Sequence, residues 1–366
     1  MSMFFRSALM IIFVLGLMSS ADGADLSWID ADDLVVEGRA FDERAKTFDR
    51  LPGRAEGVVR DPVWNLSRHS AGMLIRFQTD APDIHVRWTL SNDQLGMPHM
   101  PATGVSGVDL YARADHGRWR WVGNGRPTAV ENSARLMSGS APAKGDSREY
   151  LLYLPLYNGT EKLEIGVPEG YEVVMPPDRP EDRRKPVVFY GTSITHGGCA
   201  SRPGMTHVAI LGRRFDRPVV NLGFSGNGTL DLEIADFLAE IDAEVYVLDC
   251  LPNLNGQKVR ERAVPFVKKL RALRPDVPIV LVEDRTYAGS EFHAGRRKRN
   301  EENRAALQAA YQALIADGFT DIEYVDGDSL LGEDGEGTVD GSHPTDLGFM
   351  RQADALQPAI DTSIRN

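Results

Sequence analysis

Cysteine is scarce in this sequence, and long apolar segments are missing beyond the first residues. The chain of 366 residues contains only two cysteines, Cys199 and Cys250, which are too few for a disulfide scaffold. The two thiols can pair in an oxidising compartment, and two buried free thiols are an equally good interpretation. Because no cluster of Cys, His or carboxylates shows metal-ligand spacing, we predict no metal and no cofactor.

Positive charge is also in short supply. Lys and Arg number 41 against 53 Asp and Glu, which gives a formal net charge of -12. Nucleic acids and anionic membranes attract clustered positive charge, so we expect neither as a partner. The hydrophobic content of 42% is typical of a globular protein, and the length favours two domains. A neutral or weakly charged substrate fits this composition.

The one long apolar run lies at the start of the chain. Arg6 precedes the apolar residues 8–18, and small residues follow up to Ala24. This order is typical of a secretory signal peptide, and the run is short for a transmembrane helix. We therefore predict a signal peptide over residues 1–23, a secreted or periplasmic protein, and no stable membrane insertion after cleavage. An uncleaved membrane anchor is the alternative.

Residues 25–174 show the features of β structure. Alternating apolar positions, rich in β-branched and aromatic side chains, recur in five segments: residues 71–79, 83–90, 108–112, 150–155 and 162–167. Turn-forming residues separate the segments and no helical period is evident, so we predict an antiparallel β-sandwich or jelly roll. Trp88, Trp119 and Trp121 are interpreted as core residues, with an aromatic platform for sugars as the alternative.

A charged, proline-rich segment over residues 175–185 predicts an extended linker between two domains. Beyond it, residues 186–366 alternate short apolar strands with amphipathic helices. This alternation predicts a three-layer, flavodoxin-like α/β domain, in which helices cover both faces of about five parallel strands. The last helix is expected to begin near His343 or Pro344. The residues expected on its buried stripe are Leu347, Met350, Ala353 and Leu356.

Small and polar residues follow the first three strands of the predicted sheet. Gly191 to Ser193 follow the first strand, Asn221 to Gly228 follow the second, and Asp249 to Asn253 follow the third. The carboxyl ends of parallel strands border the usual ligand crevice of an open sheet. Ser193 is therefore a candidate nucleophile, and a helix-capping serine is the alternative.

A pair of polar residues, Asp340 and His343, lies just before the last predicted helix. An Asp at this spacing can accept a hydrogen bond from one imidazole nitrogen while the other nitrogen takes a proton from a serine. We therefore predict a triad of Ser193, His343 and Asp340. His196 is the second choice for the base, because no carboxylate lies near it in the sequence to orient its ring.

The four blocks, in this order, resemble those of the SGNH hydrolases, also called GDSL-type esterases. The match covers roughly residues 186 to 360. The resemblance implies that Ser193 is the nucleophile, that His343 and Asp340 activate it, and that Ser193, Gly226 and Asn253 form the oxyanion hole. Two departures are a threonine before Ser193, where name-giving members have Asp, and Leu-Pro before Asn253, where many have Gly-Gly.

A second resemblance lies in the amino-terminal part. Gly107-Val-Asp-Leu-Tyr111 is similar to the GxDLY motif of a domain that precedes the catalytic domain in one SGNH subfamily. The two resemblances together imply a secreted serine esterase that removes short acyl groups, acetyl first among them, from a carbohydrate or small-molecule ester. A lipid esterase or thioesterase of the same fold and a carbohydrate-binding protein without activity are the alternatives. No pattern specifies an oligomeric state.

Overall fold

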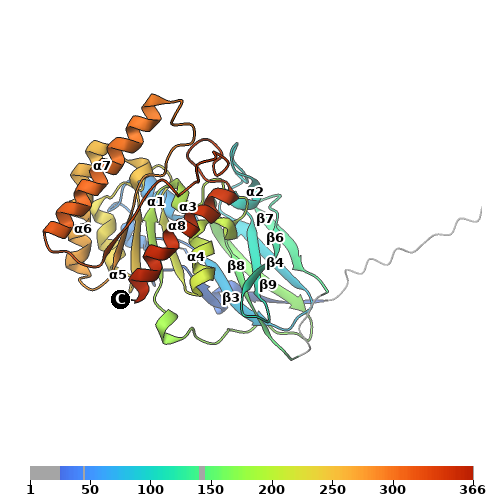
Figure 1. The fold of residues 1–366 in the computed structure, drawn as a ribbon. Coiled ribbons are helices and arrows are strands. Elements are labelled where there is room, and N and C mark those ends of the chain that lie inside the picture. The colour runs from blue at the N-terminus through green and yellow to red at the C-terminus, as the bar shows by residue number, and fades with distance from the viewer. Residues whose placement is uncertain (1–24, 44–45, 140–144, 366) are drawn as a thin grey trace, which may run out of the picture.

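The computed structural model describes residues 25–43, 46–139 and 145–365, so the predicted signal peptide lies outside the described residues. Figure 1 shows an amino-terminal part made of strands beside a carboxyl-terminal part in which helices flank a second set of strands. Both fold classes predicted from the sequence are confirmed.

The amino-terminal part contains two antiparallel sheets. The outer sheet has four strands, in the order β1 (Leu26–Asp30), β9 (Thr160–Pro168), β4 (Ile84–Leu90) and β7 (Glu131–Met137). The interface sheet has five strands, in the order β2 (Val35–Glu37), β3 (Leu74–Thr79), β8 (Arg148–Tyr153), β5 (Val108–Arg113) and β6 (Trp119–Gly125). Alternate side chains of both sheets meet in one buried apolar cluster, as expected for a sandwich.

Several elements of this part were not predicted. None of the strands β1, β2, β6 and β7 or the short helices α1 (Asp61–Ser67) and α2 (Ala102–Val105) is longer than 7 residues, which is too short to establish a clear period. In β7, for example, only Leu136 is buried, and the strand owes its conformation to pairing with β4 along most of its length. Such strands are specified by tertiary context more than by their own sequence.

The carboxyl-terminal part is built on a parallel sheet. Its five strands have the order β11 (Val219–Gly223), β10 (Val187–Gly191), β12 (Val245–Asp249), β13 (Ile279–Val282) and β14 (Ile322–Val325). This is the flavodoxin-like order, with the first strand between the second and the third. Every residue of β10, β11 and β12 is buried, as expected for strands covered on both faces.

Helices cover both faces of this sheet (Figure 1). On one face lie α4 (His207–Phe215) and α8 (Asp346–Arg365), and on the other lie α5 (Leu232–Glu240), α6 (Gly256–Leu273) and α7 (Ala294–Ala316). The helix α4 also touches the interface sheet, because Ala209 packs with Leu74, Tyr111 and Leu151. The α/β part and the sandwich therefore share an apolar contact.

The predicted buried stripe of α8 was wrong at two positions. Leu347 and Met350 are 46% and 38% exposed, whereas Phe349, Ala353, Leu356 and Ile360 are fully buried. The buried residues follow spacings of four, three and four, a regular helical stripe that starts from the largest side chain, Phe349. The Phe349 ring stacks on His207 of α4 with a centroid distance of 5.8 Å, which fixes the rotation of the helix.

The segment of residues 175–185 contains one short 3-10 helix, Glu181–Arg183, and is otherwise irregular. It is held in place by Arg179, whose Nε donates to Glu37 Oε1 at 2.7 Å and whose Nη1 donates to the Asp216 carbonyl at 2.6 Å. This arginine connects a strand of the sandwich with the end of α4. No helix within the described part of the chain is long and apolar enough to cross a membrane.

Candidate active site

The carboxyl ends of β10, β11 and β12 bring three polar loops together. Gly191 of β10 pairs with Gly223 of β11 on one side and with Asp249 of β12 on the other. Ser193 begins the short helix α3 (Ser193–His196), and the hydroxyl of Thr192 caps this helix by accepting from Ile194 N at 3.3 Å. The nucleophile candidate therefore lies at the central strand of the three, where the strand order reverses.

Ser193, His343 and Asp340 form a continuous hydrogen-bonded chain. The distance from Ser193 Oγ to His343 Nε2 is 2.8 Å, and the distance from His343 Nδ1 to Asp340 Oδ2 is 2.7 Å. The other oxygen of Asp340 accepts from the backbone N–H groups of Ser342 at 2.9 Å and His343 at 2.8 Å. Because Asp340 accepts from Nδ1–H, Nε2 is the ring nitrogen that can receive the serine proton.

The electrostatics of Asp340 support this tautomer. Partial burial raises the pKa of Asp340, but the hydrogen bonds from the His343 backbone, the His343 ring and the Ser342 backbone outweigh it and lower the pKa to about 2. Asp340 is therefore ionised at neutral pH, and its charge keeps the proton on Nδ1. His343 lies in the loop three residues before α8, and not inside the helix.

The second and third blocks are tied to each other through Asn253. Two backbone N–H groups, Asn227 N at 3.0 Å and Gly228 N at 3.1 Å, donate to Asn253 Oδ1 and thereby fix the orientation of the side-chain amide. In this orientation Nδ2 faces hydrogen-bond acceptors. Gly226 has a φ of +69°, a left-handed conformation that glycine adopts without strain. A side chain at Gly228 would overlap the Gly191 carbonyl, so this loop packs directly on the end of β10.

The Leu251-Pro252 departure does not remove Asn253 from the site. Residues Leu251–Asn253 form a single turn of 3-10 helix, and Pro252 occupies a position near its start that tolerates proline. Arg299 of α7 donates to the Pro252 carbonyl at 2.7 Å and holds this turn from outside.

His196 does not face the nucleophile. Its ring is fully buried and stacks on Tyr157 with a centroid distance of 4.1 Å, and its Nε2 bonds to the Leu156 carbonyl at 2.7 Å. Burial, together with the nearby Arg50 and His69, lowers the pKa of His196 well below its usual value. The geometry therefore does not support His196 as the base, because its ring is buried against Leu156 and Tyr157 of the sandwich.

Sandwich residues that the sequence did not single out reach the site. Tyr157, in the loop after β8, donates its hydroxyl hydrogen to the Ser193 carbonyl at 3.1 Å. His99, in the loop before α2, lies beside the triad, with its ring centroid 6.1 Å from that of His343. Neither residue belongs to a recognisable motif, so only the docking of the two parts reveals them.

A buried arginine of the amino-terminal part supports the second block. Arg50 is 1% exposed and donates through Nη1 to the carbonyls of Asn221 at 3.2 Å and Gly223 at 2.6 Å. Its Nε donates to the His69 carbonyl at 2.9 Å, and burial lowers the pKa of its guanidinium to about 9. A further N–H of Arg50 donates to the Leu66 carbonyl at 2.5 Å. Two bonds of Arg50 therefore hold the end of β11, and the two others anchor the arginine to the amino-terminal part.

The Gly107 to Tyr111 motif docks the sandwich onto the segment that follows the nucleophile helix. Asp109 Oδ2 accepts from Arg202 Nη1 at 2.7 Å and from Gly204 N at 2.9 Å. The Tyr111 hydroxyl accepts from Arg202 Nη1 at 2.6 Å. The motif therefore holds the chain that continues directly from α3.

The two cysteines are free and buried. Burial raises the pKa of Cys199 to about 12, with the charge of Asp340 adding to the rise, and burial raises the pKa of Cys250 well above its usual value. Cys250 belongs to the core beneath β10, where its Sγ lies 3.6 Å from the Tyr190 carbonyl. The two thiols therefore form no disulfide and no reactive thiolate.

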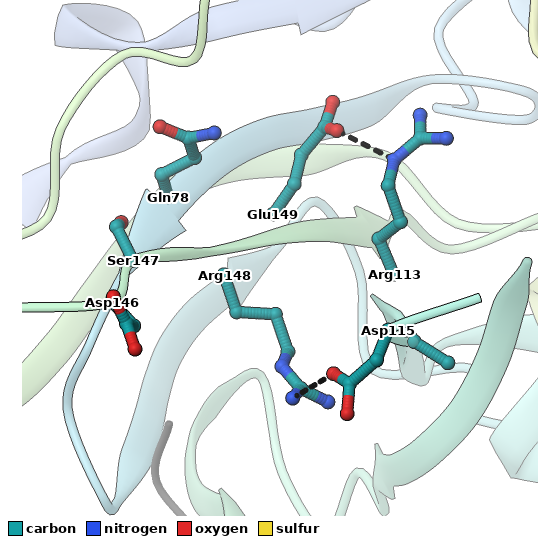
Figure 2. A pocket seen from close by; sticks show the side chains of 8 residues that line it. Gln78, Arg113, Asp115, Asp146, Ser147, Arg148 and Glu149 are labelled. Atoms are coloured by element: carbon teal, nitrogen blue, oxygen red, sulfur yellow. Dashed lines mark hydrogen bonds and ion pairs between the residues drawn. The ribbon is translucent and has the colours of Figure 1, made fainter. Parts of the chain in front are cut away.

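A hollow of about 440 Å³ lies on the sandwich and is lined by none of the triad residues. Figure 2 shows that its charged side chains are largely paired, Arg148 with Asp115 at 2.8 Å and Arg113 with Glu149 at 2.7 Å. Its lining contains no histidine, so its one serine, Ser147, has no imidazole base there. Within the described ranges, no group of three or more His, Cys, Asp or Glu side chains could hold a metal ion.

A serine bonded to an Asp-oriented histidine, at the switch point of a flavodoxin-like sheet, is the arrangement of a serine hydrolase. The comparisons with known proteins agree. The model of the GDSL-like lipase/acylhydrolase family matches residues 184–361, and the model of the N-terminus of SGNH-hydrolase-type esterases matches residues 26–173. A Bacteroides ovatus protein described as a GDSL-like lipase is 33% identical over 93% of this chain and 98% of its own, with a TM-score of 0.87. The chain belongs to the GDSL-like lipase/acylhydrolase family and is a carboxylic ester hydrolase, as its sequence predicted.

More distant solved structures share the fold. The salicylyl-acyltransferase of a tetracycline biosynthetic pathway is 17% identical over 92% of this chain and 97% of its own, with a TM-score of 0.73. An acetyl xylan esterase from the rumen bacterium Butyrivibrio proteoclasticus is 10% identical over 93% of this chain and 99% of its own, with a TM-score of 0.56. The comparison with curated protein sequences finds no match.

Proposed function

We propose that this protein is an exported serine esterase that removes acetyl groups from carbohydrate. The observation that carries the catalytic part is the unbroken chain from Ser193 Oγ through His343 to Asp340, with contacts of 2.8 Å and 2.7 Å. A serine hydroxyl is inert until a correctly oriented base takes its proton, and this chain supplies both base and orientation.

In the first half of the proposed reaction, His343 Nε2 takes the proton of Ser193 as Oγ attacks the ester carbonyl carbon. The negative charge on the carbonyl oxygen is met by the N–H groups of Ser193 and Gly226 and by the amide of Asn253. Ser193 N lies in the first turn of α3, where the helix offers its N–H no backbone acceptor. The C–O bond then breaks, and the leaving alcohol receives the proton from His343.

In the second half, water gives a proton to His343 and attacks the acyl carbon. The bond to Ser193 Oγ breaks, the acid leaves, and Oγ recovers its proton from His343. The same hydrogen-bond donors stabilise the oxyanion in both halves of the reaction, so a single oxyanion hole is sufficient. Asp340 stays ionised throughout and stabilises the imidazolium that forms twice in the cycle.

The choice of an acetylated carbohydrate is the finer part of the proposal. It is supported by the shared fold of an esterase named for acetyl xylan and by the acidic composition, which suits a neutral polymer better than a polyanion. Export is proposed from the sequence of residues 1–23 alone, which lie outside the described residues.

Acetate release from p-nitrophenyl acetate and from acetylated xylan tests the whole proposal, with Ser193→Ala in parallel. We expect both substrates to be cleaved and kcat of the variant to fall by roughly 10⁴-fold or more, as for other triad nucleophiles. Cleavage of the small ester alone would support the proposed triad and contradict the proposed carbohydrate substrate. Sugar binding without any hydrolysis would reject the enzyme.

A further inference from the structure

Trp121 is a large aromatic side chain that the fold holds in water. It lies on β6 opposite Tyr111 of β5, and it is 51% exposed. Its Nε1–H donates to Asp109 Oδ1 at 2.8 Å, and the carboxylate that accepts this bond is fully buried. The polar group of the indole is thus already satisfied by the protein, and its uncovered surface is apolar.

The same contacts fix the orientation of the ring. The guanidinium of Arg202 lies over the Trp121 ring at 5.2 Å from its centroid, and Arg202 is itself bonded to Asp109 at 2.7 Å. A cation over an aromatic face is attractive, so one face of the indole is supported. While the ring is exposed to water, its apolar surface contributes no favourable free energy of burial. A ligand that covers the ring would gain that free energy on binding.

Trp88 and Trp119, the other two candidates for an aromatic platform, differ from Trp121. Trp88 is 1% exposed and donates its Nε1–H to the Ser106 carbonyl at 3.0 Å inside the sandwich. Trp119 lies two residues before Trp121 but is half-buried, with the Arg113 guanidinium 4.2 Å from its ring centroid and its Nε1–H bonded to Asp216 at 3.2 Å. The core interpretation is therefore confirmed for Trp88 and wrong for Trp121.

Trp121 lies within reach of a chain-like substrate bound at the triad. A side chain at Gly198 would come within 3.4 Å of the His343 ring, so Gly198 borders the triad. Arg202, which supports Trp121, follows four residues later, and four residues span at most about 14 Å. Thr103 donates to the Ser201 carbonyl at 2.6 Å and holds this connection against the sandwich. The Arg202 guanidinium then lies 5.2 Å from the Trp121 ring centroid, so a polysaccharide of several sugars is long enough to touch both places.

We propose that Trp121 is a carbohydrate subsite, which stacks one sugar ring of a polysaccharide while an ester on another sugar of the same chain lies at Ser193. The proposal rests on the carbohydrate part of the proposed function. The apolar C–H face of a pyranose covers the open face of the indole, and the sugar hydroxyls stay in water. An uncharged glycan also meets no electrostatic penalty from the acidic protein.

Two substitutions at Trp121 separate stacking from simple shielding of the Asp109 and Arg202 pair. Trp121→Leu keeps an apolar cover but removes the aromatic face, and Trp121→Phe keeps the face but removes the bond to Asp109. For acetylated xylan, we expect KM to rise on the order of tenfold in the Leu variant and about twofold in the Phe variant. With p-nitrophenyl acetate, kcat/KM of both variants should stay within about twofold of the parent. Trp119→Leu, on the same strand, is the matched control and should leave the KM for xylan unchanged.

The outcome against the proposal is an unchanged KM for xylan in Trp121→Leu, or equal losses in both Trp121 variants with equal drops in Tm, which would indicate shielding alone. Direct titration with unacetylated xylohexaose, followed by tryptophan fluorescence, separates this proposal from the proposed function. Binding that Trp121→Leu abolishes supports the subsite even if the parent releases no acetate from xylan. The absence of binding by a parent that does cleave xylan would overturn the subsite and leave the esterase intact.

Discussion

The carboxyl edge of the parallel sheet and the interface sheet of the sandwich both contribute to the site, but in different ways. The sheet edge places Ser193, the proposed nucleophile, and Gly226 and Asn253, the proposed oxyanion donors, on loops that each begin within a few residues of a buried strand. The interface sheet supplies support, because Asp109 bonds the segment after α3. Each polar loop at the sheet edge is therefore recognisable from a short stretch of sequence. The contacts that hold these loops in place form only when the two domains dock.

This contrast predicts different consequences for substitutions in the two regions. A change at the sheet edge should reduce turnover by a much larger factor than its modest effect on stability would explain. A change on the interface sheet should mainly lower the free energy of unfolding. It should reduce the turnover of a small ester only slightly.

Asn253→Ala carries the larger expected effect. Removing one oxyanion donor costs about 10²-fold to 10³-fold in kcat, and we expect a loss of this size on p-nitrophenyl acetate with little change in KM. Asn255→Ala is the control, because Asn255 caps α6 by accepting from Lys258 N at 2.9 Å and takes no part in the proposed chemistry. That variant should lose about 1 kcal/mol of unfolding free energy and keep its turnover. Equal turnover losses in both variants would contradict a specific role for Asn253.

Asp109→Ala carries the smaller effect on turnover and the larger effect on stability. It leaves Arg202 and Gly204 N without their acceptor, and breaking such a pair costs roughly 3 to 5 kcal/mol when it is buried. We expect a lower midpoint in urea unfolding and a kcat for the small ester within about fivefold of the parent. Asp115→Ala is the control, since Asp115 is 93% exposed in its pair with Arg148 and should change stability by less than about 1 kcal/mol. A collapse of turnover at full stability in Asp109→Ala would show that the contrast between the regions is wrong.

The same contrast explains how far the sequence could be interpreted. The parallel sheet and the sandwich followed from patterns in which the informative residues are neighbours in sequence. The proximity of Ser193 to His343 and Asp340 followed from the order of the four blocks and their resemblance to the SGNH hydrolases. Tyr157 and Arg50 were missed because their partners, the Ser193 and Gly223 carbonyls, are backbone atoms of the other domain. No periodicity or motif marks such a contact.

The environments of His196, the second choice for the base, and of Trp121 have the same physical origin. His196 is close to Ser193 in sequence, but the turn of α3 directs its ring into the sandwich, where the Leu156 carbonyl takes its N–H. Trp121 was interpreted as a core residue, but it is 51% exposed and lies against Asp109 of the sandwich and Arg202 of the other domain. In both cases the neighbouring domain decided the environment of the side chain, and sequence spacing within one domain carries no information about it.

The most direct test of the central claim is the rate at which a serine-directed phosphonate labels the protein, with the labelled residue identified by mass spectrometry. The structure predicts one label, on Ser193, and a labelling rate that falls by several orders of magnitude in His343→Ala, because the hydroxyl then lacks its base. Labelling at another residue, or an unchanged rate in His343→Ala, would contradict the account.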